Sequence, residues 1–210
     1  TEKLNTLSYC NITNSQGYYS DIASKKSELH TGGAVTIISS SVIMEFCSIT
    51  KNSSDKGGAV YAVGSEIFFR GNYFTKNTAN EGGVFYLVLC KANFTGNSIY
   101  KNEAKNIAGV MLSFGSTVDM YRNRIVENKS QVEGGIYEED SNISYRYNNI
   151  SRNRGKPPKT ALVAEILREL PAVVAAERES VRLQMVADKI SEGVSVKTPV
   201  EEVTPEQIKQ

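Results

Sequence analysis

The sequence predicts a mainly β fold, a right-handed parallel β-helix of about five to six coils, followed by an α-helical C-terminal tail. Three observations predict the β-helix. A Gly-Gly pair recurs about every 25 residues, the string Asn-x-Ile/Phe-x-x-Asn recurs in step with it, and apolar residues alternate with polar ones inside each repeat. Alternation is the periodicity of strands, and a fixed period of roughly 20 to 50 residues indicates stacked structural units.

The glycine marker predicts one tight corner in each coil. It occurs four times as a glycine pair and once with alanine in the first place, and the steps between the second residues are 25, 25, 26 and 26. A positive φ, or the close approach of the next coil, would exclude a Cβ atom at such a corner. We therefore expect Ala108 to be tolerated only if the first residue of the corner has an ordinary φ. The copies are Gly32-Gly33, Gly57-Gly58, Gly82-Gly83, Ala108-Gly109 and Gly134-Gly135.

The asparagine marker aligns the repeats and predicts which residues stack along the axis. Three apolar columns are expected to fill the interior. The asparagines are expected at turns, where their amides can form ladders and their tolerance of left-handed backbone bends the chain. The marker copies are Asn72 to Asn77, Asn97 to Asn102, Asn123 to Asn128 and Asn148 to Asn153, with Cys47 to Asn52 and a shortened copy from Cys10 to Asn14. The apolar columns are Val42, Ile67, Ala92, Val118 and Ile143; Met44, Phe69, Phe94, Met120 and Tyr145; and Ile49, Phe74, Ile99, Ile125 and Ile150.

Composition excludes several classes of function. The 24 basic and 23 acidic residues give a net charge of +1, which does not suit a long basic groove for nucleic acid. No run of 18 apolar residues is present to span a membrane. The spacing of the three cysteines matches no zinc motif. Cys10 and Cys47 fall in one column, where we expect free, buried thiols rather than a disulfide, and Cys90 is expected to be unpaired.

Composition also divides the chain into two parts. Every Asn, Tyr, Phe and Cys lies within residues 1–156, whereas residues 160–192 have the Ala, Leu, Val, Glu and Arg content of helices. We predict a β-helix over residues 1–155, a proline-rich joint over 156–159, and a helical tail over 160–210 with helices at about 160–170 and 172–192. The tail is expected to cap the open end of the solenoid or to mediate oligomerisation. The apolar residues of the two helices are Leu162, Val163, Ile166, Leu167 and Leu170, and Val174, Val181, Met185, Val186 and Ile190.

An insertion of about 12 residues separates the first two coils. The step from Cys10 to Cys47 is 37 residues, so the extra residues lie within 14–31. Polar loops that leave a repeat scaffold are frequent binding sites. A possible binding loop therefore contains Tyr18, Tyr19, Lys25 and Lys26, and the alternative is a longer solvated turn. The single histidine, His30, also lies there and is expected to have a surface role.

The sequence gives little support to a catalytic site. A carbohydrate-active β-helix needs carboxylates, or a carboxylate and a basic residue, that converge from neighbouring coils. The outward columns stack no two carboxylates. Asp119, expected between Asn93 and Ser144, is the best single candidate, with a solvated strand residue as the alternative. The acidic cluster at 138–140 lies within one coil and is expected to be an exposed loop. We predict no catalytic residue, cofactor or metal.

A basic row is predicted along one turn of the solenoid. Like charges stacked one coil apart repel, so such a row requires solvent, counterions or an acidic ligand. A weak contact with a glycan or another anionic surface is one interpretation. The alternative is structural, because long polar side chains are expected before a turn and lysines at exposed edges deter aggregation. The row consists of Lys51, Lys76, Lys101 and Arg152, with Glu127 in the fourth of its five positions.

The coupled markers resemble the repeats of polymorphic outer membrane proteins, whose signatures are Gly-Gly-Ala-Ile/Leu/Val and Phe-x-x-Asn. The resemblance covers residues 1–154 and is carried by the strings from Gly32 to Val35, Gly57 to Val60, Gly82 to Phe85, Gly134 to Tyr137 and Phe74 to Asn77. It implies a surface-exposed or secreted β-helical region, often adhesive, and no catalytic residues. Isoleucine replaces the phenylalanine in the other copies.

These observations favour a noncatalytic, adhesin-like β-helical scaffold, extracellular or at the cell surface, that binds a protein or glycan partner. One alternative is a carbohydrate-active lyase or hydrolase whose catalytic coils lie elsewhere. The other is a structural subunit of a large assembly, docked through the helical tail. We expect no nucleic acid and no membrane span.

Overall fold

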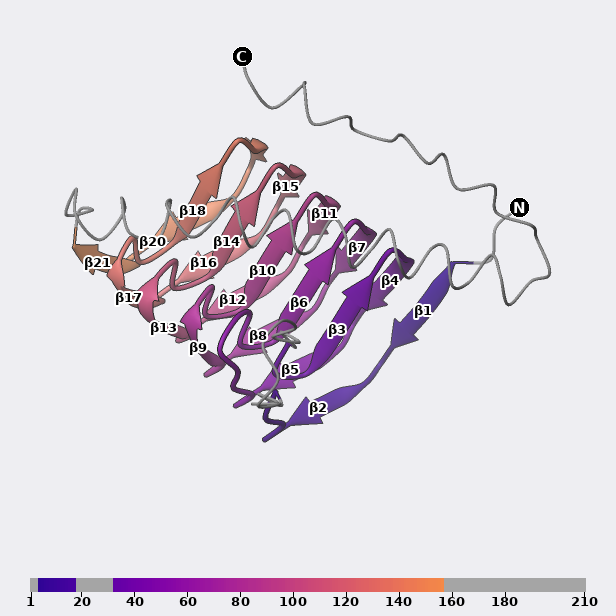
Figure 1. Cartoon of the computed structure of the whole chain (residues 1–210), viewed down its shortest axis with the longest axis horizontal. Coiled ribbons are helices and arrows are strands. Elements are labelled where there is room, and N and C mark those ends of the chain that lie inside the picture. The colour runs from indigo at the N-terminus through magenta and orange to yellow at the C-terminus, as the bar shows by residue number, and fades with distance from the viewer. Residues whose placement is uncertain (1–3, 18–31, 157–210) are drawn as a thin grey trace, which may run out of the picture.

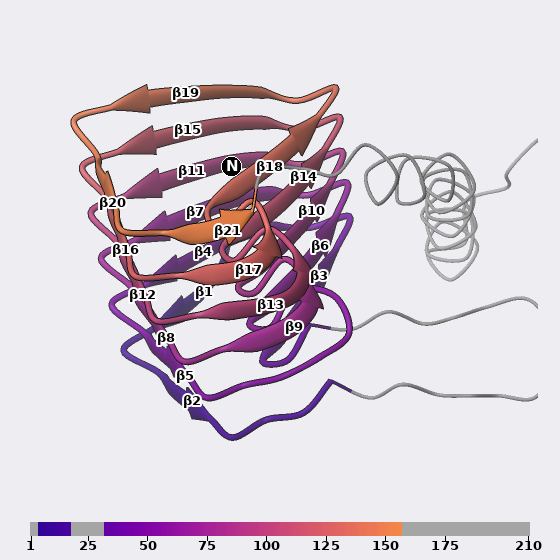
Figure 2. The ribbon, with the colours of Figure 1, turned by 90° about the vertical axis from the view of Figure 1, so that its left-hand side faces the viewer.

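The computed structural model describes residues 4–17 and 32–156, which form a parallel β-solenoid (Figures 1 and 2). Each coil from residue 60 onward passes through four short strands that belong to four different parallel sheets. In one coil these strands are β6 (Val60–Val63), β7 (Glu66–Arg70), β8 (Tyr73–Thr75) and β9 (Thr78–Glu81). We name the four sheets D, A, B and C in this order. The next coil then begins one strand further along the axis.

Equivalent strands of successive coils pair in parallel and build the four sheets. Sheet A contains β1 (Asn5–Ser8), β4 (Ser41–Glu45), β7, β11 (Lys91–Thr95), β15 (Thr117–Tyr121) and β19 (Asn142–Arg146). Sheet B contains β2 (Asn11–Thr13), β5 (Ser48–Thr50), β8, β12 (Ser98–Tyr100), β16 (Arg124–Val126) and β20 (Asn149–Ser151). Sheet C contains β9, β13 (Glu103–Ile107), β17 (Lys129–Val132) and β21 (Arg154–Lys156). Sheet D contains β3 (Val35–Ile38), β6, β10 (Phe85–Val88), β14 (Met111–Phe114) and β18 (Ile136–Glu139).

The three predicted interior columns are in register. Phe69 pairs with Phe94, and Phe94 pairs with Met120 on the next coil. The rings of Phe69 and Phe94 stack with their centroids 4.6 Å apart, and Phe85 of sheet D meets both rings from the opposite wall. The other two columns pair in the same way. The solenoid core is therefore a set of like-on-like rows buried between the sheets, as the alternating pattern predicts.

Two columns of buried asparagines join the coils at the corners. In the column at the corner between sheets B and C, Asn102 Oδ1 accepts hydrogen bonds from the backbone N–H of Asn77 at 2.9 Å and from Asn77 Nδ2 at 3.1 Å. Asn102 Nδ2 in turn donates to Asn128 Oδ1 at 2.9 Å and to the carbonyl oxygen of Phe74 at 3.1 Å. Each carboxamide thus uses its donors and acceptor on the coils before and after it, and the predicted ladders are confirmed.

The ladders lie at two different corners. The corner between sheets A and B contains Asn72, Asn97, Asn123 and Asn148. The corner between sheets B and C contains Asn52, Asn77, Asn102, Asn128 and Asn153.

The residue before each ladder asparagine makes the bend, not the asparagine itself. Lys76 and Lys101 have φ of 56° and 55°, whereas no ladder asparagine has a positive φ. Our expectation that the asparagines adopt left-handed backbone is therefore wrong. The reason is geometrical: the asparagine must direct its amide inward to join the ladder, so the preceding residue takes the left-handed conformation and turns its side chain to solvent.

The glycine corner combines two separate constraints. Its first residue is left-handed, with φ of 60° at Gly82 and 59° at Ala108, so the expectation of an ordinary φ at Ala108 is wrong. The second residue is limited by the next coil, because a Cβ atom on Gly83 would lie 2.4 Å from the carbonyl oxygen of Gly109. A Cβ atom on Gly82 would also lie 2.2 Å from the carbonyl oxygen of Phe85, yet Ala108 takes the same place in the next coil, so the first position admits a side chain where the neighbouring backbone shifts.

The last glycine pair is displaced by one residue from the others. A Cβ atom on Gly109 would lie 2.4 Å from the carbonyl oxygen of Gly134, so Gly134 stands above Gly109. Glu133 takes the left-handed position with φ of 50°, and the final step is 25 residues rather than 26. Gly135 takes the position that Val110 has in the preceding coil. The N–H of Val110 donates to the carbonyl oxygen of Gly135 at 2.9 Å.

Cysteine takes the place of a polar ladder residue at three positions. Cys47 precedes Asn72 by one coil, and its backbone N–H donates to Asn72 Oδ1. The Cys47 Sγ atom accepts a hydrogen bond from the N–H of Cys10 at 3.4 Å and donates to the carbonyl oxygen of Leu7. Cys90 replaces serine in a third ladder at the corner between sheets D and A, formed by Ser40, Ser65, Ser116 and Ser141. All three thiols are free, as predicted.

Several predicted features lie outside the described residues. They are the joint beyond Lys156, the helices at 160–170 and 172–192, the remainder of the tail to residue 210, and the insertion residues Tyr18, Tyr19, Lys25, Lys26 and His30.

Replacing Asn102 with alanine is expected to lower the free energy of unfolding by roughly 3 kcal/mol or more. The change removes the acceptor of the buried Asn77 backbone N–H and Nδ2 groups and a donor to the carbonyl oxygen of Phe74, and each buried group left without its partner costs about 1–3 kcal/mol. Chemical denaturation followed by circular dichroism measures the loss. The matched control is Asn93→Ala, which removes an outward asparagine of sheet A in the same coil and should cost less than about 0.5 kcal/mol. Equal losses in the two variants would contradict a structural role for the ladder.

Candidate functional site

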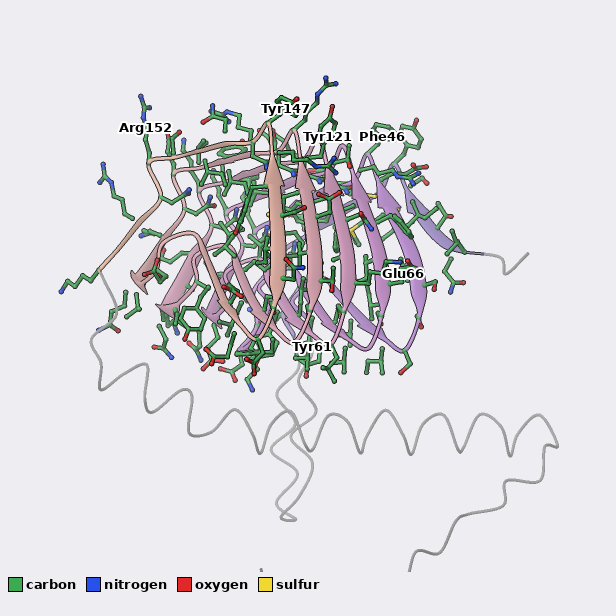
Figure 3. All side chains as sticks on the ribbon, turned by 90° about the horizontal axis from the view of Figure 1, so that it is seen from above. Phe46, Tyr61, Glu66, Tyr121, Tyr147 and Arg152 are labelled. Carbon is green, nitrogen blue, oxygen red and sulfur yellow. The ribbon has the colours of Figure 1, made fainter. Side chains whose placement is uncertain are left out.

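The predicted basic row is assembled at the corner between sheets B and C. Lys51, Lys76, Lys101 and Arg152 each precede a ladder asparagine, have φ between 55° and 58°, and are exposed. Successive coils separate neighbouring members by about 4.8 Å along the axis. The structure therefore brings all four residues onto one solvent-facing edge, at one end of which Arg152 projects (Figure 3).

Glu127 interrupts the basic row, but the row as a whole remains positively charged. Its carboxylate lies 3.9 Å from Lys101 Nζ and 3.7 Å from Arg152 Nη1. All three side chains are at least 40% exposed, so these ion pairs contribute little to stability. Four positive charges and one negative charge leave the row with a net charge of +3. Within the described ranges, Lys51 and Lys76 have no carboxylate at ion-pair distance.

A pair of tyrosines on the outer face of sheet B lies beside the row. The rings of Tyr73 and Tyr100 meet edge to face with their centroids 5.1 Å apart, and their hydroxyls share a hydrogen bond. That hydrogen bond, ahead of the charges on Lys101 and Lys76, lowers the pKa of Tyr100. Sequence analysis missed this pair because the tyrosines occupy different columns, Tyr73 at the start of β8 and Tyr100 at the end of β12.

Asp119 lies on the outer face of sheet A, between Asn93 and Ser144 as predicted. Ser144 Oγ donates to Asp119 Oδ1 at 2.6 Å, and Arg146 Nη2 donates to Oδ2 at 2.7 Å. The hydrogen bond from Ser144 and then the guanidinium of Arg146 hold the pKa of Asp119 below its ordinary value of 3.8. The group is therefore ionised at neutral pH, which suits an electrostatic or basic role and not that of a general acid.

Exposed aromatic residues mark the corner between sheets A and B. Tyr9 and Phe46 stack with their centroids 5.3 Å apart, and Tyr121 and Tyr147 meet edge to face at 5.7 Å. Tyr147 is 82% exposed. Phe46, Tyr121 and Tyr147 follow one edge in Figure 3. A Cβ atom on Gly71 would lie 2.8 Å from the Phe46 ring, so this ring occupies the space beside the glycine of the next coil.

The acidic cluster at 138–140 is not a loop. Glu138 and Glu139 belong to β18, and Asp140 makes the following corner with φ of 48°. Tyr137 Oη donates to Glu139 Oε2 at 3.2 Å. Burial, followed by the charge of Glu139, raises the pKa of Tyr137 to about 12. The parallel coil continues through this segment, so its acidic residues remain in a strand that sequence analysis took for a loop.

Two shallow hollows lie away from Asp119 and the basic row. One, of about 410 Å³, opens into the apolar interior beside β1 and β3 and is lined by residues such as Leu7 and Met44. The other, of about 500 Å³, follows the corner between sheets D and A. It contains the ion pair between Lys91 Nζ and Glu66 Oε1, at 2.9 Å. Neither hollow has converging carboxylates.

The described residues contain no recognisable metal centre. Among residues 4–17 and 32–156, no three His, Cys, Asp or Glu side chains lie close enough together to hold a metal ion. No helix within these ranges is long and apolar enough to cross a membrane. The candidate loop residues Tyr18, Tyr19, Lys25 and Lys26 are not placed by the structure.

A family model described as the right-handed β-helix region matches residues 2–161. The chain belongs to the right-handed β-helix family. This establishes the predicted handedness of the solenoid over about five coils, and it agrees with the parallel register of the four sheets. No curated protein and no solved structure matches the chain. This fold suggests a surface scaffold or a carbohydrate-active β-helix protein.

Ser144→Ala is expected to raise the pKa of Asp119 toward 3.8, because the serine hydroxyl is the main cause of its depression. In the unaltered protein, the carboxylate loses its partners only as the pH falls through the depressed value, so its stabilising contribution is present above 3.8 and disappears in more acidic solution. NMR titration of the carboxyl carbon measures the midpoint.

The matched control is Ser151→Ala, which alters a serine of the same coil on sheet B and should leave the midpoint unchanged. A midpoint at or above 3.8 in the unaltered protein would show that the Ser144 and Arg146 contacts do not form in solution.

Proposed function

We propose that the protein is a noncatalytic, adhesin-like β-helical scaffold that binds an anionic glycan along the corner between sheets B and C. The main support for this proposal is the exposed basic row, whose members lie on successive coils at one corner. The row consists of Lys51, Lys76, Lys101 and Arg152. Localisation outside the cell or at its surface is part of the proposal, and it is supported by the resemblance to polymorphic outer membrane protein repeats.

The geometry of the row favours an extended anionic ligand. Positive charges repeated at about 4.8 Å repel one another unless a negative partner or counterions offset them. A linear acidic polysaccharide that lies along the axis presents its charges at regular intervals to the row. The neighbouring rings of Tyr73 and Tyr100 add apolar faces with polar hydroxyls, a combination enriched at binding surfaces. An acidic protein surface would have the charge but not the same linear repeat.

The outward columns support a binding role over catalysis. In the described coils Asp119 is neighboured by Asn93 and Ser144, and no second carboxylate stacks against it. Its ionised state and its contact with Arg146 are nevertheless the features that favour the alternative, a carbohydrate-active enzyme with further catalytic coils elsewhere. A third candidate, a structural subunit docked through residues 160–210, is favoured by the apolar stripes in the sequence of that segment.

Replacing Lys51, Lys76 and Lys101 with serine is expected to weaken binding to polygalacturonate by roughly 3-fold to 100-fold, since each exposed ion pair contributes about 0.2–1 kcal/mol. Binding should also weaken with added salt, because the charges are exposed. Isothermal titration with polygalacturonate and with neutral dextran measures both effects. The matched control replaces Lys91, Lys105 and Lys129, which removes the same charge from sheets A and C and should retain the affinity.

Equal weakening by the two triple variants would mean that net charge, not the row, determines binding. An acidic protein partner with no affinity for the polysaccharide would replace the glycan proposal. Release of new reducing or unsaturated chain ends from either polysaccharide, abolished by Asp119→Ala, would establish the enzymatic alternative.

A further inference from the structure

The outer face of sheet D carries columns of large apolar side chains. Along β6, Val60 and Ala62 belong to the interior cluster, whereas Tyr61 and Val63 belong to a second cluster on the opposite side of the sheet. The strand register extends this second cluster across the sheet. The outward columns are Tyr61, Tyr86, Leu112 and Tyr137, and Val63, Val88 and Phe114.

These outward side chains are shielded from water although they point away from the solenoid interior. Tyr61, Tyr86 and Phe114 are 1%, 2% and 3% exposed, and Leu112 is fully buried. Ring contacts of 5.5 Å and 5.6 Å join the three aromatic residues, and Lys56 Nζ lies 5.1 Å from the centroid of the Tyr86 ring. Ile107 and Val132 of sheet C border the same cluster. Every strand within 4–17 and 32–156 belongs to the wall of the solenoid, so no described strand lies over this face (Figure 2). The described strands therefore do not account for the burial of the whole face.

The open end of the last coil is not shielded in this way. Tyr145 and Ile150 are the last members of two interior columns, and they are 48% and 46% exposed. The covered surface is therefore the side of sheet D and not the end of the solenoid. In Figure 3, Tyr61 marks that side, opposite the edge that carries Phe46, Tyr121 and Tyr147.

The chain leaves the solenoid beside this face. In each earlier coil, a strand of sheet C is followed by a left-handed residue and then by a strand of sheet D. Lys156 pairs with Val132, and in the sequence Pro157 follows Lys156 as Glu133, which has a φ of 50°, follows Val132. The proline ring fixes φ near −65° and excludes a left-handed residue at that step. The last described residue, Lys156, lies in sheet C beside the border with sheet D.

The sequence of the tail suits the apolar face. Residues 160–192 contain ten apolar positions spaced for one side of two helical segments, with Pro171 between them. The five strands of sheet D span about 19 Å along the axis, and a helix over residues 172–192 would measure about 31 Å. The insertion at residues 18–31 also precedes a strand of sheet D in the sequence, but it is short and mostly polar.

We propose that residues 160–192 lie along the solenoid axis as an amphipathic helical segment and cover the outer face of sheet D. The tail is then a lateral part of the fold that buries Tyr61, Tyr86, Leu112 and Phe114. It neither caps the end nor serves primarily as a contact between copies. This inference is independent of the proposed glycan contact, which lies at a different corner.

Hydroxyl-radical footprinting with mass spectrometry tests the proposal on the intact chain and on a variant that lacks residues 157–210. In the intact protein, Tyr86 and Phe114 should be protected, while Tyr147, which is 82% exposed, provides the reference rate. Without the tail, oxidation of Tyr86 and Phe114 should rise toward the rate of Tyr147. Protection of the interior residues Phe69 and Phe94 reports whether the solenoid is still folded.

A substitution pair tests the same contact without truncation. Ile166→Asn with Met185→Asn places two polar groups in the apolar stripe and should increase the oxidation of Tyr86 and Phe114. Glu165→Asn with Gln184→Asn changes neighbouring positions outside the stripe and should leave both residues protected. A variant lacking residues 18–31 should also leave them protected.

Three results would overturn the proposal. The first is protection of Tyr86 and Phe114 that persists without the tail while Phe69 stays protected. The second is a rise in oxidation of Tyr145 alone, which would place the tail over the open end. The third is protection that is lost on dilution of the intact chain, which would assign the cover to a second copy.

Discussion

The carboxamide ladder is the interaction on which the solenoid depends. A buried asparagine without partners is costly, yet Asn77, Asn102 and their equivalents pair all their polar atoms with the coils on either side. This arrangement works only when successive coils place an asparagine at the same point of the turn. The ladder therefore fixes the register at two corners, and the three apolar columns follow from that register because side chains alternate across each strand.

The position of an added residue in one coil supports this view. The step from Asn102 to Asn128 is 26 residues, one more than the step from Asn77 to Asn102. The extra residue is absorbed in β13, where the register with both neighbouring strands shifts between Ala104 and Ile107. A bulge in sheet C leaves both ladders continuous. The chain thus tolerates a change of length where no buried amide has to find a partner.

Sequence analysis could predict the columns but not every backbone detail. Alternation and the repeat length determine that Phe69, Phe94 and Met120 stack, because a slip of one residue would turn the whole set outward. The conformation of the turns could not be obtained in this way. Both Lys101 and Asn102 suit a turn, and only the inward amide contacts show that the lysine takes the left-handed position.

The sequence predicted the candidate surface that lies within one column and missed the contacts that join different columns. The basic row could be found because its members share one column. Tyr73 and Tyr100 could not be found, because their contact crosses from one column and coil to another. The serine ladder, in which Cys90 replaces a serine, was also missed, since Ser40, Ser65 and Ser116 were not part of either repeat marker.

The left-handed corner residues connect the fold to its surface chemistry. At the two corners that carry asparagine ladders, the left-handed residue turns outward and the ladder asparagine beside it secures the bend, so the identity of that residue is free to vary. One corner accordingly carries Lys51, Lys76 and Lys101, while another carries Tyr9, Phe46 and Tyr147. The outer face of sheet D has no such freedom, because Tyr86 and Leu112 are buried on it. A rod built in this way has one side committed to packing, and variable binding chemistry lies on the corners and outer faces that remain in water.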